Sequence, residues 1–287
     1  MDNKNIIAKF QSTLSLYEGK VLSELLAQHG MRPAQFTQIV LTEIKKSPQM
    51  LEAFQNNPSS LFASILHCAE IGLSPSAEVG EFFFIPFKGS IKPMVGYKGL
   101  CNLIMRNSNV RFIHAETVHR GDDFDWELGL HPKLVHRPKN LVRNSTTLTH
   151  VYAIAKLNNG ENIFKVMSVQ EIRSIMATMK KVNELYFDDQ KDPMMWMPKK
   201  TCIKQLAKLL PKDYYQSRAL AVDDNMEGGA ILTLDEDNRP VIVQSTKAPV
   251  RAKKANLYTA LSNLTQDSVD LQHADTEVSD ELTQEAQ

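Results

Sequence analysis

The amino-acid sequence predicts an α+β protein with N-terminal helices, a mostly antiparallel sheet, further helices and an acidic C-terminal tail. Apolar residues recur with helical spacing before residue 73 and again after Ser168. Between these regions, short alternating segments separated by turn residues are typical of antiparallel strands. With 287 residues and 43% hydrophobic composition, the chain is long enough to bury a sizeable core.

Residues 1–72 are expected to be helical. Pro33 suits the first turn of a helix. The apolar face of this helix is predicted at Phe36, Ile39, Val40 and Ile44. Ser59 or Ser60 is expected to cap the next helix, and Gly72 to end it. The apolar side of that helix holds Leu61, Ile65, Leu66 and Ala69.

The central region predicts strands and one short helix. Residues 81–87 form an aromatic strand in which Pro86 indicates an edge or a bulge. Residues 91–95 are its hairpin partner across Lys88-Gly89-Ser90, and a helix carrying Leu100, Leu103 and Ile104 follows. Further strands are predicted at 110–119, 124–127, 133–136, 147–157 and 162–167. The turn Asn158-Asn159-Gly160 between the last two is a strong hairpin signal.

Helical periodicity returns at Ser168, which forms a capping box with Glu171. The buried face of this helix is predicted at Val169, Ile172, Ile175, Met176 and Met179. A second helix is predicted to open at Pro198 and to run to about Leu210, where Pro211 stops it.

The resulting domain prediction is a helical region at 1–72, a central core at 73–243, a linker at 244–256 and an acidic tail at 257–287. Leu257, Leu261 and Leu264 give the tail one apolar edge of a short helix. No apolar run approaches the length of about 20 residues that spans a bilayer. The predicted location is cytoplasmic.

Charge is segregated along the chain although the formal net charge is zero. Residues 84–212 hold 21 Lys and Arg against 11 Asp and Glu, a net of +10, whereas residues 213–287 hold 6 against 14, a net of −8. A basic middle region followed by an acidic tail is expected of a domain that binds a polyanion. The alternative interpretation is a solvated, lysine-rich surface.

The strongest local signal is a row of lysines on the helix after Trp196. Lys200, Lys204, Lys208 and Lys212 share one face, opposite the apolar residues. No glutamate lies four residues away to pair with them, so a phosphate backbone or solvent is expected to neutralise this face. Lys199 lies toward the apolar side of this helix, so it could contact DNA only from the first turn.

A second group of candidates surrounds the aromatic hairpin and the turn after it. Lys88, Lys92 and Lys98 would contact phosphates and Tyr97 would stack on bases, an interaction worth about 1–3 kcal/mol per base. The alternative for Tyr97 is a buried ring. Gly96 and Gly99 would let the backbone approach a phosphate closely, and Arg106 and Arg111 are further candidate contacts.

Several classes of site have no motif in this sequence. There is no G-x-x-x-x-G-K-[ST] loop for ATP, no G-x-G-x-x-G, no H-E-x-x-H and no C-x-x-C pair. Two aspartate clusters leave a metal-dependent nuclease as an alternative, although turn residues explain them better. The clusters are Asp122, Asp123 and Asp125, and Asp188, Asp189 and Asp192. An RNA-binding chaperone is a third interpretation.

An ordered series of short motifs resembles the RecT family of phage recombinases, which are single-strand annealing proteins. The resemblance covers about Gly72 to Pro211, and its specificity lies in the order and spacing of the motifs. In chain order they are Gly72-Leu73-Ser74-Pro75, Ile85-Pro86-Phe87, Gly96-Tyr97-Lys98-Gly99-Leu100, Asp123-Phe124, His136-Arg137-Pro138, Tyr152-Ala153-Ile154-Ala155, Met197-Pro198-Lys199-Lys200-Thr201, Lys208 and Leu210-Pro211.

The resemblance implies a protein without catalytic residues, metal or other cofactor that coats single-stranded DNA and pairs it with a complementary strand without ATP. It implies a curved antiparallel sheet braced by helices, and oligomeric rings or filaments to which residues 1–72 contribute contacts. The DNA would lie in a basic groove between the lysine helix and the sheet. A phage exonuclease is the expected partner, and the tail would contact a host single-strand binding protein.

Overall fold

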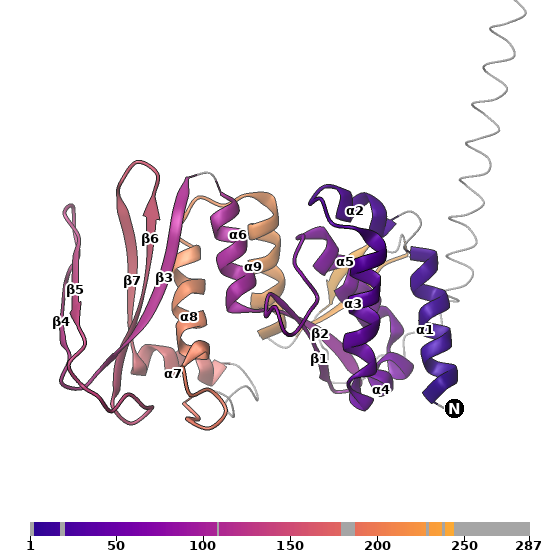
Figure 1. The fold of residues 1–287 in the computed structure, drawn as a ribbon, viewed down its shortest axis with the longest axis horizontal. Helices are drawn as coiled ribbons and strands as arrows, with labels where there is room; N and C mark the ends of the chain where they lie inside the picture. The colour runs from indigo at the N-terminus through magenta and orange to yellow at the C-terminus, as the bar shows by residue number, and fades with distance from the viewer. Residues whose placement is uncertain are drawn as a thin grey trace, which may run out of the picture.

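The computed structural model describes residues 3–17, 21–107, 109–178, 187–227, 230–236 and 239–243. Its elements follow one another along an elongated body, with strands at one end and the N-terminal helices at the other (Figure 1). The combination of helices with antiparallel sheets confirms the α+β class. The predicted linker and tail at 244–287 lie outside the described residues.

Five helices precede the first strand, as the periodicity of residues 1–72 predicts. They are α1 (Asn3–Tyr17), α2 (Ser23–Ala27), α3 (Pro33–Lys45), α4 (Pro48–Asn56) and α5 (Pro58–Glu70). Pro33 opens α3 in its first turn, and α5 ends just before Gly72, whose φ is +64°. The cap of α5 differs from the prediction, because Asn57 caps it by accepting from the backbone N–H of Ser60 at 3.2 Å.

The aromatic hairpin consists of β1 (Phe82–Phe87) and β2 (Ser90–Val95). Lys88 and Gly89 form its two-residue turn with φ of 49° and 74°, so Ser90 belongs to the second strand and not to the turn. The α6 helix (Tyr97–Arg106) follows at once. Gly96 and Gly99 lie against the backbone of the chain entering β1, where a Cβ would approach Gly80 O and Glu81 O to 2.1 and 2.2 Å. Tight packing within the protein therefore accounts for both glycines.

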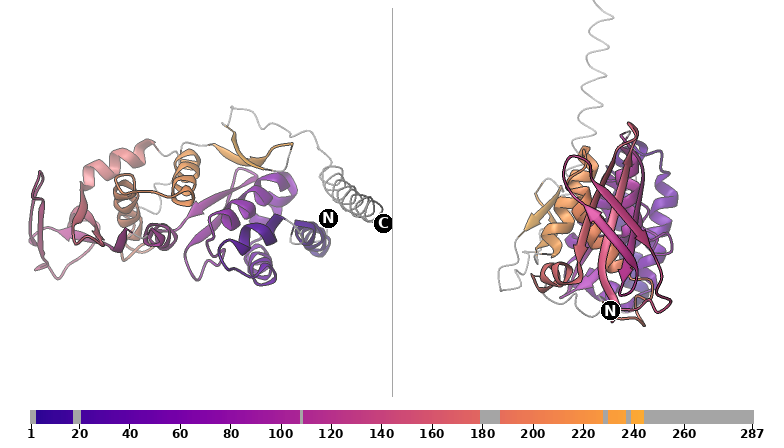
Figure 2. Two further views of the ribbon diagram at one scale, coloured as in Figure 1. Left: turned by 90° about the horizontal axis from the view of Figure 1, so that it is seen from above. Right: turned by 90° about the vertical axis from the view of Figure 1, so that its left-hand side faces the viewer.

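A three-stranded antiparallel sheet has the order β3-β6-β7, with β3 (Val110–His119), β6 (Leu148–Leu157) and β7 (Asn162–Ser168). The turn at 158–160 joins β6 to β7 as predicted. A separate hairpin of β4 (Asp123–Glu127) and β5 (Lys133–Arg137) lies beside this sheet at the end of the molecule (Figures 1 and 2). The predicted strand positions are confirmed within one residue, but the described strands form four sheets.

Two helices follow the sheet, α7 (Val169–Thr178) and α8 (Trp196–Ala207). The Ser168–Glu171 capping box is confirmed, since each backbone N–H donates to the other side chain at 2.7 and 3.1 Å. The α8 helix begins two residues earlier than predicted, because the carboxylate of Asp192 accepts from the backbone N–H groups of Trp196 and Met197 at 2.8 Å each. Pro198 then lies in the first turn, where its missing N–H costs no helical hydrogen bond.

Within its described residues, the chain after Pro211 forms three elements that the sequence pattern did not predict. They are α9 (Tyr214–Glu227), β8 (Ile231–Leu234) and β9 (Pro240–Val243). The α9 helix packs against α6 and β2, and the β8–β9 hairpin packs against α5. These elements place the beginning of the acidic region, residues 213–243, against the basic central region.

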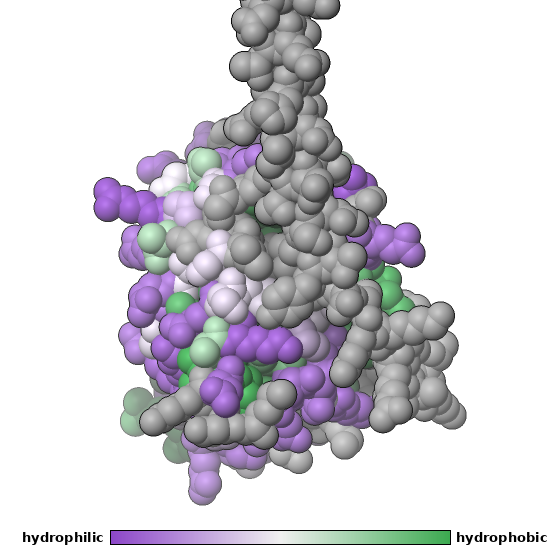
Figure 3. Space-filling model, turned by 90° about the vertical axis from the view of Figure 1, so that its right-hand side faces the viewer, coloured by the Kyte–Doolittle hydropathy of each residue, from purple (hydrophilic) through white to green (hydrophobic). Residues whose placement is uncertain are grey.

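The N-terminal end of the molecule presents a mostly hydrophilic surface with small hydrophobic patches between polar residues (Figure 3). None of the helices within the described ranges combines the length and the apolar content that crossing a bilayer requires.

Glu70 ties the end of α5 to α9. Its carboxylate accepts a hydrogen bond from the hydroxyl of Tyr214 at 2.8 Å and pairs with Nε of Arg218 at 3.3 Å. On the α5 side, Nδ1 of the buried His67 lies 3.4 Å away. Burial alone would raise the pKa of Glu70, but the hydrogen bonds from His67 and Tyr214 and the charge of Arg218 lower it to about 2.

The depressed pKa of Glu70 predicts a loss of stability in acid. Its contribution to the free energy of unfolding is complete above the unfolded pKa of about 4.3 and is lost as the pH falls toward 2. We expect Glu70→Gln to be less stable than the wild type by up to about 3 kcal/mol near pH 6, with the difference shrinking toward pH 2. Urea denaturation across this pH range measures it, and a difference that is constant with pH would contradict the assignment.

Candidate nucleic-acid interface

The α8 helix carries most of the predicted DNA-binding lysines and is buried on nearly all sides. It packs against β3, β6 and β7 on one side and against α6 on another. Lys199, Lys200 and Lys204 are only 5%, 7% and 4% exposed. Burial raises the pKa of the Cys202 thiol, which lies between these lysines in sequence, to about 12. The predicted solvent-facing lysine stripe is therefore wrong for Lys200 and Lys204, whereas the burial of Lys199 agrees with its predicted place toward the apolar side.

Carboxylates from α9 neutralise the lysine face. The ammonium group of Lys204 lies 2.8 Å from a carboxylate oxygen of Asp223 and 2.8 Å from one of Asp224. Lys200 approaches Asp223 at 3.6 Å, and Lys208, whose side chain is 40% exposed, reaches Asp224 at 3.2 Å. The physical reason for the correction is α9, a helix that the sequence pattern did not predict and that supplies both aspartates.

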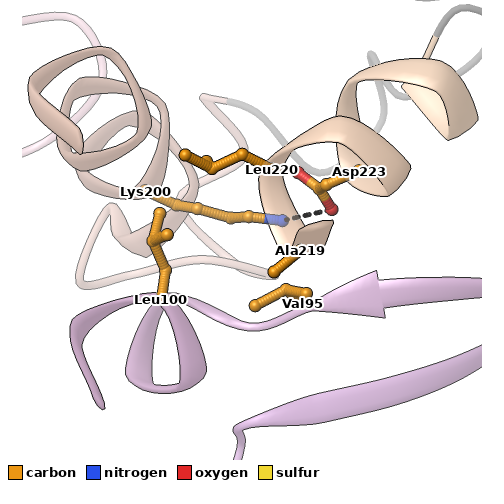
Figure 4. A pocket seen from close by; sticks show the side chains of 6 residues that line it. All are labelled: Val95, Leu100, Lys200, Ala219, Leu220 and Asp223. Carbon is orange, nitrogen blue, oxygen red and sulfur yellow. Dashed lines mark ion pairs between the residues drawn. The ribbon is translucent and has the colours of Figure 1, made fainter. Parts of the chain in front are cut away.

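The Lys200 side chain passes Leu100 and Leu220 to reach Asp223 (Figure 4). The remaining cavity is about 10 Å³, at the lower limit for one water molecule. Burial would raise the pKa of Asp223, but Lys200 and Lys204 outweigh it and lower that pKa. Asp223 is thus held as an anion between two buried cations.

Lys199 has a different partner. Its ammonium group pairs with a carboxylate oxygen of Glu116 on β3 at 2.9 Å and lies 4.8 Å from the centre of the Trp196 ring. On the other side, Trp196 stacks on Tyr97 with ring centres 4.3 Å apart and planes 7° apart. The structure therefore brings Tyr97 and Lys199, which are distant in sequence, to one tryptophan.

The hairpin lysines differ in exposure. Lys88 lies exposed at the tip of the turn, 5.4 Å from the centre of the Phe87 ring. Lys92 lies 4.2 Å from that centre and donates to the carbonyl oxygen of Met226 at 3.2 Å. Burial, and then the charge of Lys88, lowers the pKa of Lys92. Lys92 therefore links β2 to α9, whereas Lys88 faces solvent.

The remaining candidates lie on α6 and β3. Lys98 is exposed on the first turn of α6, next to Tyr97. At the other end of this helix, the guanidinium of Arg106 donates to the carbonyl oxygens of Ile71 and Gly72 at 2.8 and 2.5 Å, so it closes the end of α5. Arg111 is exposed near the start of β3.

Aspartates of the first predicted cluster have structural partners. The Asp122 side chain is fully buried and accepts from the backbone N–H groups of His119 and Lys139, both at 2.9 Å. The side chains of His136 and Arg143 donate to the same carboxylate, both at 3.1 Å. Burial opposes ionisation here, but these hydrogen bonds hold the pKa of Asp122 well below its usual range.

The aspartates of the second cluster also accept hydrogen bonds from within the protein. Asp188 accepts from backbone N–H groups of its own turn, and Asp189 accepts from the N–H and hydroxyl of Ser145 at 2.8 Å each. Asp192 caps α8. Across the described ranges, no three His, Cys, Asp or Glu side chains gather as a metal site would require.

Sequence reasoning missed four residues of this region, Trp196, Glu116, Asp223 and Asp224. Trp196 was visible as an aromatic residue at the start of a lysine-bearing helix. The adjacent acidic pair at 223–224 was the available signal for a partner of the lysines. Glu116 gave no local signal, because its contact with Lys199 spans a separation of 83 residues.

Comparisons with known proteins match most of this chain. The model of the RecT family matches residues 34–242. Protein RecT of Escherichia coli strain K12 is 30% identical over 229 residues, which cover 77% of this chain and 80% of that protein. The uncharacterized protein YqaK of Bacillus subtilis strain 168 is 29% identical over 97 residues, which cover 34% of this chain and 33% of that protein.

A family match across most of the chain defines the class, a DNA-binding protein of recombination that anneals single strands. The chain belongs to the RecT family, which the ordered motifs from Gly72 to Pro211 predicted.

The two ends of the lysine row should respond differently to truncation. Lys204→Ala leaves Asp223 buried beside fewer cations and should lower the free energy of unfolding by about 3–5 kcal/mol. The matched control Lys208→Ala removes a half-exposed pair and should cost less than about 1 kcal/mol. Urea denaturation of both variants measures this contrast, and equal losses would show that burial does not govern these pairs.

Proposed function

We propose that this protein binds single-stranded DNA and anneals complementary strands without ATP and without chemical conversion of the DNA, as an oligomeric ring or filament. The single observation that supports this proposal most strongly is the RecT family match over residues 34–242, which contains every candidate cation and aromatic. The central unit at 73–243 is the proposed DNA-binding core, and residues 1–72 are the proposed source of oligomer contacts.

The proposed phosphate contacts are exposed candidates, and Arg106 is left out because its exposed guanidinium already donates to two backbone carbonyl oxygens. Lys88, Lys98, Arg111 and Lys208 are exposed, and long cationic side chains in water can reach a phosphate without breaking a buried pair. Five candidates have partners within the fold, and we assign them the structural role of stabilising the elements that carry the exposed cations. They are Lys92, Arg106, Lys199, Lys200 and Lys204.

The proposed partners are single-stranded DNA, the annealed duplex and further copies of the chain. A phage exonuclease that generates single strands and a host single-strand binding protein that meets the acidic tail complete the proposal. Phosphate contacts without base-edge readout predict binding that is independent of sequence.

Annealing of two labelled complementary oligonucleotides, followed by energy transfer, tests the function. We expect the protein to accelerate pairing without ATP and with a chelator present. Strand lengths should stay unchanged with Mg²⁺ or Mn²⁺ on a denaturing gel, whereas shortened strands would favour the nuclease alternative. Competition between matched DNA and RNA strands tests the chaperone alternative. In the annealing assay, a failure of the protein to accelerate pairing would contradict the proposal.

Salt and charge removal test the proposed contacts. If four exposed cations each neutralise one phosphate, affinity should fall by about 50-fold between 50 and 200 mM salt. The triple variant Lys88→Ala, Lys98→Ala, Arg111→Ala should weaken binding to all sequences and flatten this salt dependence. The matched control removes three exposed cations from the N-terminal helical region, Lys9→Ala, Arg32→Ala and Lys45→Ala. Equal effects of the two triple variants would mean that net charge alone matters.

A further inference from the structure

Tyr97 and Trp196 form a stacked aromatic pair at the surface. Each is the first residue of its helix, α6 and α8, and the two helices pack against each other. The ring planes are 7° apart, a parallel arrangement, whereas most other aromatic pairs described in this protein are tilted or edge-on. Trp196 is 39% exposed and Tyr97 is partly exposed.

The pair is held from several directions. The carboxylate of Asp192 fixes the start of α8 by accepting from the Trp196 N–H at 2.8 Å. Lys199, anchored by Glu116, lies 4.8 Å from the Trp196 ring centre. On the α6 side, Gly99 lets the helix approach the Glu81 backbone closely. The positions of both rings are therefore set by the fold before any ligand arrives.

The surface beside the pair suits a nucleotide. Exposed Lys98 follows Tyr97 in the chain, so the first turn of α6 carries both a ring and an exposed cation. The first turn of α6 holds no acidic residue, which leaves the positive end of its helix dipole uncompensated there. Aromatic rings beside cations are the combination that single-strand binding surfaces use for bases and backbone.

We propose that the Tyr97–Trp196 pair is a base-stacking site, in which a nucleobase of the bound single strand stacks on the exposed part of the pair. Tyr97 contacts the base, and Trp196 is a positioning residue that holds the Tyr97 ring. This inference rests on the proposed binding of single-stranded DNA and extends it from phosphates to bases.

Stacking is compatible with annealing because it uses the face of a base and leaves its pairing edge accessible. It is also tolerant of sequence, since every base has an aromatic face. The site would therefore hold a strand at a fixed position on the protein surface without selecting its sequence.

The intrinsic fluorescence of Trp196 reports on the site directly. The chain has two tryptophans, so Trp126→Phe leaves Trp196 as the single emitter. Titration with an oligothymidine strand should quench or shift this emission. A strand of equal length with abasic sites carries the same phosphates without bases, and at saturation it should leave the emission unchanged.

Affinity measurements separate stacking from charge. Tyr97→Ala and Trp196→Ala should each weaken binding of oligothymidine by about 5- to 150-fold, with little effect on the abasic strand. Tyr97→Phe should restore base-dependent binding because it keeps the ring. The double variant should lose no more than the larger single loss, because the two rings act as one unit. Trp126→Ala, which removes a comparably exposed tryptophan from the β4–β5 hairpin, is the matched control and should show no base-dependent loss.

The outcomes distinguish this inference from the function on which it rests. If the wild type binds neither strand, the proposed function fails. If it binds both strands equally and Trp196 emission does not respond to oligothymidine, the base-stacking site is overturned while DNA binding stands. Should Trp196→Ala fail to fold, the fluorescence titration and Tyr97→Phe against Tyr97→Ala still decide the question.

Discussion

The neutralisation of the α8 lysines is the interaction on which the rest of the structure depends. This helix is enclosed by the β3-β6-β7 sheet and by α6, so its cations enter the interior only with carboxylates beside them. Glu116 supplies one from the sheet, and Asp223 and Asp224 supply two from α9. The α9 helix packs against α6 and β2, which brings its aspartates to these lysines, and the β8–β9 hairpin that follows packs against α5.

The same enclosure determines which groups remain for a ligand. Because Lys199, Lys200 and Lys204 are committed to internal pairs, the cations that we propose as DNA contacts lie on the β1–β2 turn, the start of α6, the start of β3 and the end of α8. The helix start is fixed by Asp192, which places Trp196 against Tyr97. A buried ionic network thus supports a surface that combines cations with a stacked aromatic pair.

The sequence predicted the elements whose signals are local. Alternation predicted the strands at 110–119 and 147–157, the Asn-Asn-Gly turn predicted the hairpin between the second of these and the strand at 162–167, and Ser168 with Glu171 predicted the start of α7. It did not predict α9, whose buried positions include small or polar residues such as Ala219, Gln216 and Asp223 and show no clear apolar face. The orientation of the lysine row also escaped prediction, because a helical wheel separates two faces but cannot show that both are buried. Tyr97 was found from its neighbours, whereas its contact with Trp196 depends on tertiary structure alone.

The sharing of two aspartates by three lysines has an evolutionary consequence. Loss of Asp223 alone would leave Lys200 buried without this carboxylate and Lys204 with Asp224 alone, and loss of Lys204 alone would leave Asp223 with only the longer contact to Lys200. The fitness effect of any one change at these positions therefore depends on the state of the others, which is epistasis built into the core. Divergence within the family should pass through linked replacements at 200, 204, 223 and 224, whereas the half-exposed Lys208 should drift more independently.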